Sequence, residues 1–212
     1  MKIVLFGGSG MIGSRIAKEA LDRGHQVTAV GREPAKIELK HPALQTAKGD
    51  VLDPASITAI ALGHDAAISA YSPGHPGDPR NLVKAAQALL AGLKPAGVKR
   101  LLVVGGAGSL EVKPGLRLVD TPEFPAAWKP VALAHADALQ VFRGEKTLEW
   151  SYLSPAAFIA PGERTGKYRL GGEQLVIDAK GESRISAEDY AVAVLDELER
   201  PRHVRARFTA AY

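Results

Sequence analysis

A cluster of glycines near the start of the chain constrains the fold more than any other feature. It follows a short apolar run at residues 2–6 and opens a helical pattern, and it satisfies two spacings, G-x-G-x-x-G at Gly8, Gly10 and Gly13 and G-x-x-G-x-x-G from Gly7. Strand, glycine turn and helix together form a phosphate site, because small residues let a diphosphate approach the N–H groups of the helix N-terminus. We expect a diphosphate ligand here, and the alternative is an ordinary glycine turn without one.

The bulk properties indicate one globular domain. The 212 residues are 46% apolar and 24% charged, which is ordinary for a soluble protein. The net charge is only +4, and basic residues gather only in the tail, at Arg200, Arg202, Arg205 and Arg207. Because Arg205 and Arg207 alternate on an expected strand, they favour a solvent-facing surface over a nucleic-acid site.

Further functional classes are disfavoured by what the chain lacks. It has no cysteine, so it can form neither a disulfide nor a thiolate metal site. Its six histidines show no ligand-pair spacing, and we expect no metal. No window approaches the roughly 18 apolar residues of a membrane span, and the start does not resemble a secretion signal. We expect a cytoplasmic protein that binds neither membrane nor nucleic acid.

Strands and helices alternate through the first half of the chain. We expect strands at residues 2–6, 26–30, 44–47, 66–70 and 99–104, and helices at residues 11–21, 54–61 and from about 80 to 94. Asp53 is the expected N-cap of the second helix, and Val83, Ala86, Leu90 and Leu93 the expected buried face of the third. Alternation at this interval predicts right-handed βαβ units, and therefore an α/β fold with a three-layer, doubly wound parallel sheet in a single domain over residues 1–212.

The second half is less regular. Residues 111–130 show no clear pattern, residues 131–143 and 187–198 predict helices, and residues 150–153 and 205–212 predict strands, with short strands between 170 and 185. Loops at residues 71–79, 107–128 and 155–168 leave the carboxyl ends of strands, where ligands of open α/β sheets bind. We expect residues 107–128 and 154–186 to form most of a small, irregular substrate part within the same domain.

The residue after the second strand indicates which dinucleotide is bound. In dinucleotide folds an acidic residue there accepts a hydrogen bond from the ribose 2′-hydroxyl, and a basic residue accommodates a 2′-phosphate. This chain has Arg32 at that point. NADP is therefore favoured over NAD, although the neighbouring Glu33 leaves room for NAD. Asp50 fits either a contact to adenine or a simple turn.

Taken together, these segments resemble an atypical short-chain dehydrogenase/reductase of the branch that includes NmrA-like proteins, biliverdin reductase B and flavin reductase-like proteins. The resemblance covers almost the whole chain and is carried by residues 7–13, Arg32, residues 49–51, Gly105 with Gly106, and residues 150–155. It implies an NAD(P)-binding Rossmann fold. The implied cofactor residues are Gly7, Ser9, Gly10, Met11, Ile12, Gly13, Arg32, Asp50, Val51, Ala70, Tyr71, Gly105, Pro155 and Ala156, the last two beside the nicotinamide.

The chain departs from the better-known members at the catalytic helix. Those members carry Tyr-x-x-x-Lys, in which lysine lowers the pKa of a tyrosine that protonates a carbonyl. Here Val131 and His135 occupy the two positions. His135 is the best substitute proton donor, and Ser109 is a candidate hydrogen-bond donor to a substrate carbonyl. A structural histidine and an ordinary turn serine are the alternatives.

Three functions fit this pattern. The first is an NADPH-dependent oxidoreductase that transfers a hydride to a small planar acceptor such as a flavin, quinone or carbonyl compound. The second is a silent NADP(H)-sensing regulator of the NmrA type, which the missing dyad favours. The third is an epimerase or dehydratase of the nucleotide-sugar type. In each case we expect a small-molecule ligand and a monomer or homodimer.

Overall fold

A central parallel sheet organises the computed structural model, which describes residues 1–74 and 77–212. Among these residues the main sheet has eight strands in the order β10-β12-β8-β5-β4-β1-β2-β3, and only β10 runs antiparallel to its neighbour. The order reverses direction between β1 and β4, as it does in a dinucleotide-binding fold. The expected doubly wound parallel sheet is confirmed.

The main-sheet strands are β1 (Lys2–Phe6), β2 (Gln26–Gly31), β3 (Leu44–Lys48), β4 (Ala66–Ser69), β5 (Arg100–Val104), β8 (Glu149–Ser154), β10 (Arg169–Gly171) and β12 (Ala206–Ala211). Two small sheets pair β6 (Glu111–Lys113) with β7 (Leu116–Arg117) and β9 (Phe158–Ala160) with β11 (Arg184–Ser186). The helices are α1 (Met11–Asp22), α2 (Pro54–Ala61), α3 (Asn81–Leu93), α4 (Lys129–Gly144) and α5 (Ala187–Glu199), with 3₁₀ turns at Pro34–Lys36, Leu118–Asp120 and Ala126–Trp128.

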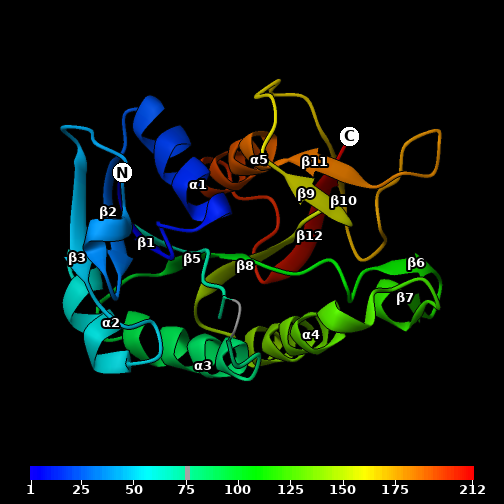
Figure 1. Cartoon of the computed structure of the whole chain (residues 1–212). Helices are drawn as coiled ribbons and strands as arrows, with labels where there is room; N and C mark the ends of the chain where they lie inside the picture. The colour runs from blue at the N-terminus through cyan, green and yellow to red at the C-terminus, as the bar shows by residue number, and fades with distance from the viewer. Residues whose placement is uncertain (75–76) are drawn as a thin grey trace.

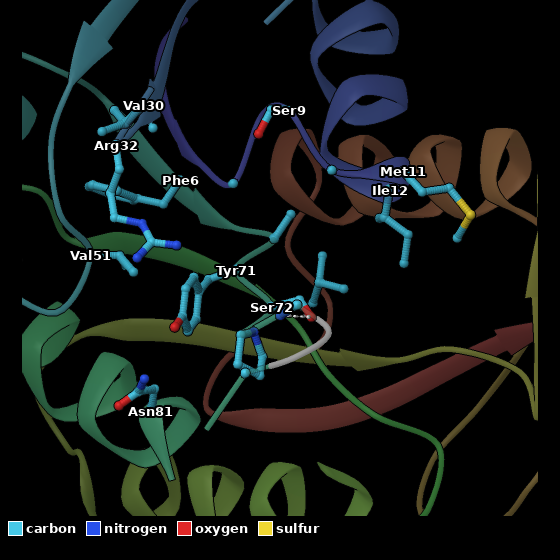
Figure 2. Close-up of a pocket in the computed structure, with 18 of the residues that line it drawn as sticks. Phe6, Ser9, Met11, Ile12, Val30, Arg32, Val51, Tyr71, Ser72 and Asn81 are labelled. Carbon is cyan, nitrogen blue, oxygen red and sulfur yellow. Dashed lines mark hydrogen bonds between the residues drawn. The ribbon is translucent and has the colours of Figure 1, made fainter. Parts of the chain in front are cut away.

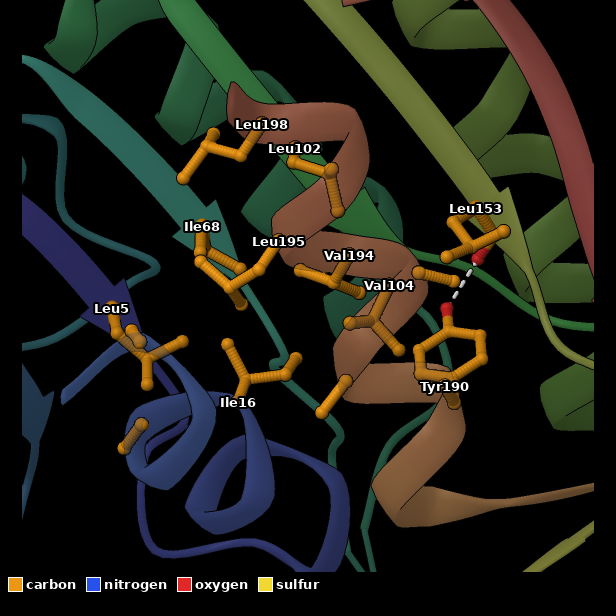
Figure 3. Close-up of a cluster of buried hydrophobic side chains, with 14 of the residues drawn as sticks. Leu5, Ile16, Ile68, Leu102, Val104, Leu153, Tyr190, Val194, Leu195 and Leu198 are labelled. Carbon is orange, nitrogen blue, oxygen red and sulfur yellow. Dashed lines mark hydrogen bonds between the residues drawn. The ribbon is translucent and has the colours of Figure 1, made fainter. Parts of the chain in front are cut away.

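Helices cover both faces of the sheet. Figure 1 shows α1 and α5 side by side on one face, and α2, α3 and α4 in a row on the other. The strands read as continuous apolar runs because both faces are buried: in β1, Ile3 and Leu5 pack toward α1 and α5, whereas Val4 and Phe6 pack toward the opposite layer. Figure 3 shows the core between the sheet and the α1 and α5 layer, in which Tyr190 donates a 2.6 Å hydrogen bond to the Leu153 carbonyl.

Helix boundaries follow local chemistry, with two departures from expectation. Asp53 caps α2 as expected, since its carboxylate accepts from the Ala55 N–H at 3.0 Å. Helix α4 begins at Lys129, two residues earlier than expected, because Pro130 fits the first turn, where no N–H is needed. Of the expected buried face of α3, Ala86 and Leu93 are buried, whereas Val83 and Leu90 are only partly buried because Leu82 and Leu89 take the inward positions.

The expectation of a solvent-facing tail was wrong for Arg207. Strand β12 does not lie at an edge: it pairs with β8 on one side and β10 on the other. Arg207 is buried because the segments that carry Ser109 and Glu173 cover its face of the sheet, and its guanidinium contacts both residues. Arg205, just before the strand, has a positive φ of 55°.

Within the described residues, helices fall short of the length and apolar character that crossing a membrane requires.

Candidate functional site: a dinucleotide-shaped cavity

The glycine loop after β1 is shaped by close backbone contacts. Gly7 has a φ of +86°, and a Cβ there would lie 2.5 Å from the Ala70 carbonyl oxygen at the end of β4. A Cβ on Gly13 would lie 2.1 Å from the Gly7 carbonyl oxygen. Only glycine therefore fits at these two positions: Gly7 allows the turn, and Gly13 allows α1 to pack against it.

Helix α1 starts without the groups that normally satisfy a helix N-terminus. Its N-cap, Gly10, offers no side-chain oxygen, and its first turn contains no acidic residue. By contrast, α5 is capped by Ser186, which accepts from the Asp189 N–H, and has Glu188 in its first turn. Free N–H groups and the positive end of the helix dipole therefore remain available at α1 for an anion.

A cavity of about 750 Å³ lies at this helix end. It follows the carboxyl ends of the strands from β3 across β2, β1, β4 and β5 to β8, and Figure 2 shows side chains from the glycine loop, from β2 and from the segment after β4 around it. Its position at the point where the strand order reverses is where open α/β sheets bind ligands. The uncapped helix, the glycine cradle and the size of the cavity fit a dinucleotide.

The structure brings most of the expected cofactor residues together. Those that line the cavity are Gly7, Ser9, Gly10, Met11, Ile12, Arg32, Asp50, Val51, Ala70, Tyr71, Gly105 and Pro155. Two do not line it: Gly13 lies within α1, and Ala156 is buried in the core beside α5. The expected ligand loop at residues 71–79 contributes Tyr71, Ser72, Pro73, Gly74, Gly77 and Asp78, whereas its residues 75 and 76 lie outside the described part of the chain.

Arg32 and Glu33 differ in their availability to a ligand. Arg32 is exposed, lines the cavity, and has no hydrogen-bond partner among the described residues. Figure 2 shows its guanidinium extending toward Tyr71. Burial raises the pKa of Tyr71, and the nearby positive charge of Arg32 partly opposes this rise. Glu33 instead pairs with Lys36 at 2.9 Å and does not line the cavity. Asp50 makes a turn, because its carboxylate accepts from the Leu52 N–H at 2.9 Å.

His135 lines the β5 side of the cavity. A Cβ on Gly106, just after β5, would lie 2.9 Å from the His135 Cβ, so the glycine makes room for it. His135 Nδ1 lies 3.3 Å from the hydroxyl of Tyr152 on β8. Burial lowers the pKa of His135 to about 4, so the imidazole is neutral at physiological pH. This environment does not favour the expected role of His135 as a proton donor.

Ser109 lies apart from the cavity lining. Its hydroxyl accepts a hydrogen bond from the buried Arg207 at 2.8 Å, and Arg207 also pairs with Glu173. Glu173 in turn pairs with Arg143 of α4 at 2.9 Å. Ser109 is thus part of a network that joins β12, α4 and the segment after β10.

Sequence reasoning missed several lining residues. Ile159 on β9 and Asn81 at the start of α3 both face the cavity. Asn81 follows the loop that was expected to hold a ligand, and its position at a helix start is a signal that points to it. Tyr152 of β8 does not line the cavity, and its contact with His135 depends on packing between β8 and α4 that no local pattern reveals.

A family model for NAD(P)H-binding proteins matches residues 7–201, which include the glycine loop and every residue that lines the cavity except Phe6 of β1. The chain belongs to this NAD(P)H-binding family. A nicotinamide cofactor is therefore the dinucleotide class that the cavity serves, although the family does not distinguish NADP from NAD.

Solved structures resemble the whole chain. A proposed exported protein from Burkholderia pseudomallei is 52% identical with a TM-score of 0.92, and each chain covers 100% of the other. A proposed epimerase from Bacteroides thetaiotaomicron is 44% identical with a TM-score of 0.92, over 100% of this chain and 96% of that one. A proposed NADH-flavin reductase from Streptococcus pneumoniae is 38% identical with a TM-score of 0.87, over 100% and 99%.

Proposed function

We propose that the protein is an NADPH-dependent reductase that passes a hydride to a small planar acceptor. The choice of NADPH rests on the two residues that follow β2. Arg32 lines the cavity and has no partner among the described residues, whereas Glu33 is paired with Lys36 outside the cavity. A guanidinium donates two parallel hydrogen bonds to a phosphate, whereas it cannot accept from a ribose hydroxyl. The similarity to a proposed NADH-flavin reductase supports the reductase class.

Residues along the cavity divide the work of binding. The N-terminus of α1 holds the diphosphate, Arg32 holds the 2′-phosphate, and Val51 packs against adenine. Gly105 and Pro155, at the ends of β5 and β8, flank the nicotinamide. When bound, the cofactor supplies a hydride from C4 of its ring. The segment after β8, of which Pro155 and Ile159 line the cavity, holds the acceptor against that ring, whereas the expected residues 107–128 do not line the cavity.

The proton that accompanies the hydride comes from water in this proposal. Reduction of an acceptor A follows NADPH + A + H⁺ → NADP⁺ + AH₂. Because His135 is neutral near pH 7, it has no readily available second proton to donate. Flavins and similar acceptors take up a solvent proton after hydride transfer, so proximity and orientation are the main demands on the protein.

A change at Arg32 tests the cofactor choice. We expect Arg32→Ala to weaken NADPH binding by about tenfold to a hundredfold, because charge-assisted hydrogen bonds of about 1.5–3 kcal/mol are lost. NADH binding should change little. Dissociation constants for both nucleotides, measured by titration calorimetry, check this.

Arg202→Ala is a matched control, since it removes the same charge from an exposed residue outside the cavity. Loss of NADPH affinity in this variant as well would indicate a general charge effect. Equal losses of NADPH and NADH affinity in Arg32→Ala would contradict the assignment of Arg32 to the 2′-phosphate.

The missing Tyr-x-x-x-Lys supports a second candidate, an NADP(H) sensor without catalysis. Val131 occupies the tyrosine position on α4 and does not line the cavity. Absorbance of the nicotinamide band distinguishes the two when purified protein is mixed with NADPH and a panel of flavins, quinones and aldehydes. Oxidation that depends on the protein supports the reductase, and tight binding without oxidation by any acceptor supports the sensor.

A further inference from the structure

A histidine and a tyrosine meet just below the acceptor end of the cavity. His135 comes from α4 and lines the cavity, whereas Tyr152 comes from β8 and is 1% exposed. The two glycines after β5 leave space for both rings: a Cβ on Gly105 would lie 2.1 Å from Tyr152 Cε1, and one on Gly106 would lie 2.9 Å from the His135 Cβ. Any larger residue at either position would separate the pair.

The shorter of two contacts of the Tyr152 hydroxyl indicates where its proton lies. Burial raises the pKa of Tyr152, so its hydroxyl keeps its single proton. The hydroxyl donates that proton to the backbone carbonyl of His135 at 3.0 Å. The Tyr152 oxygen can then only accept from His135 Nδ1, which lies 3.3 Å away. The proton of the imidazole is therefore on Nδ1, and Nε2 carries a lone pair.

Nε2 has no partner among the described residues. Among these residues, the imidazole ring makes one hydrogen bond, from Nδ1 to Tyr152. His135 also borders the cavity, so Nε2 is free to bond with a ligand there. A neutral imidazole with a bare nitrogen accepts a hydrogen bond and repels a bare carbonyl oxygen.

We propose that Tyr152 is a positioning residue that holds His135 in the Nδ1–H form, so that Nε2 selects acceptors bearing an N–H or O–H group. The inference rests on the proposed reductase function and narrows its substrate class. A planar heteroaromatic acceptor with an imide or lactam N–H, such as an isoalloxazine ring, fits this site. A simple quinone, which presents only carbonyl oxygens, does not.

The tautomer is measured without turnover. With ¹⁵N-labelled histidine, long-range ¹H–¹⁵N spectra of the full-length protein distinguish a protonated Nδ1 from a protonated Nε2, and His135→Gln assigns the signals. We expect a neutral Nδ1–H ring in the wild type and a shift toward the Nε2–H form, which is preferred in water, in Tyr152→Phe. Tyr190→Phe is the matched control: it removes another buried hydroxyl that donates to a backbone carbonyl, but one without a contact to His135. An Nε2–H ring in the wild type would overturn the proposal.

The acceptor choice is tested with riboflavin and its N3-methyl derivative, which lacks the imide N–H. Loss of one hydrogen bond of about 1 kcal/mol predicts a KM about fivefold higher for the methylated flavin in the wild type. In His135→Ala this ratio should fall to about one if the wild-type difference comes from that hydrogen bond. An equal KM for both flavins in the wild type would overturn the selectivity. If neither flavin oxidises NADPH but a quinone does, the selectivity is overturned and the reductase assignment stands. If no acceptor oxidises NADPH, the reductase assignment fails, and competition of the two flavins for the NADPH-loaded protein still reports the hydrogen bond.

Discussion

Two glycines with nearly the same φ angle differ in their surroundings. Gly7 and Gly24 have φ values of +86° and +79°, but a Cβ on Gly7 would meet the Ala70 carbonyl at 2.5 Å, whereas one on Gly24 meets nothing within 4 Å. Alanine at Gly24 therefore incurs only the cost of a left-handed conformation, about 1–2 kcal/mol. Alanine at Gly7 incurs that cost and a backbone clash.

We expect Gly7→Ala to lose at least about 1 kcal/mol more unfolding free energy than Gly24→Ala, because the clash must displace β4 or the phosphate loop. Urea unfolding of both variants measures the difference. Only Gly7→Ala should also weaken nucleotide binding. Equal losses of stability would mean that the contact with Ala70 is easily relaxed.

His135 links stability to pH with a definite sign. Its pKa is about 4 in the folded chain and near 6.5 in an unfolded one, so between these values the unfolded state takes up a proton that the folded state does not. Stability therefore falls as the pH drops from 6.5 toward 4, with no further contribution below the folded pKa. The full effect is on the order of 3 kcal/mol.

A His135→Gln variant removes this contribution while keeping a polar side chain. We expect the unfolding free energy of the variant minus that of the wild type to increase as the pH is lowered from neutral to about 5. Urea unfolding at several pH values provides the comparison, in which other titrating groups cancel. Parallel pH profiles would show that the imidazole is readily protonated in the folded protein.

At the scale of elements, a buried ion pair joins α5 to the sheet. Glu197 of α5 accepts from Arg100 of β5 at 3.1 Å, and the same carboxylate accepts from the backbone N–H groups of Arg202 and His203. Burial alone would raise the pKa of Glu197, but the hydrogen bonds from His203 and Arg202 hold it below its usual value. This carboxylate thereby fixes the turn that leads into β12.

We expect Glu197→Ala to lose about 3–5 kcal/mol of unfolding free energy, because it leaves the Arg100 charge buried without its partner. Asp22→Ala, which breaks the exposed pair with Lys18, should cost no more than about 1 kcal/mol. Thermal or urea unfolding ranks the two variants. A small loss for Glu197→Ala would mean that water reaches Arg100 and replaces the carboxylate.

Elements that local patterns specify were predicted well. The strand and helix around the glycine loop and the helix expected at residues 187–198 were confirmed. The error at Arg207 has a nonlocal cause, since its burial depends on the distant segments with Ser109 and Glu173 that cover this face of β12. Alternating charges indicate a solvent-facing strand only where no further strand or loop covers it.

At the scale of the whole molecule, the cavity followed from topology. Parallel strands bring their carboxyl ends to one edge of the sheet, so residues after β1, β2, β3, β4, β5 and β8 had to converge there. The ion pair of Glu33 with Lys36 and the contact of Tyr152 with His135 needed coordinates, because side-chain partners depend on packing rather than on strand order. The sequence thus predicted where a ligand binds better than what happens to it.

The central claim is that this cavity passes a hydride from NADPH to an acceptor, and one single-turnover measurement tests it directly. Protein saturated with NADPH is mixed rapidly with riboflavin in the absence of oxygen, using cofactor that is either unlabelled or deuterated at C4. We predict a protein-dependent decay of the nicotinamide absorbance that is slower with the deuterated cofactor, because a C–H bond breaks in that step. An absorbance that stays constant while NADPH is bound would contradict the account.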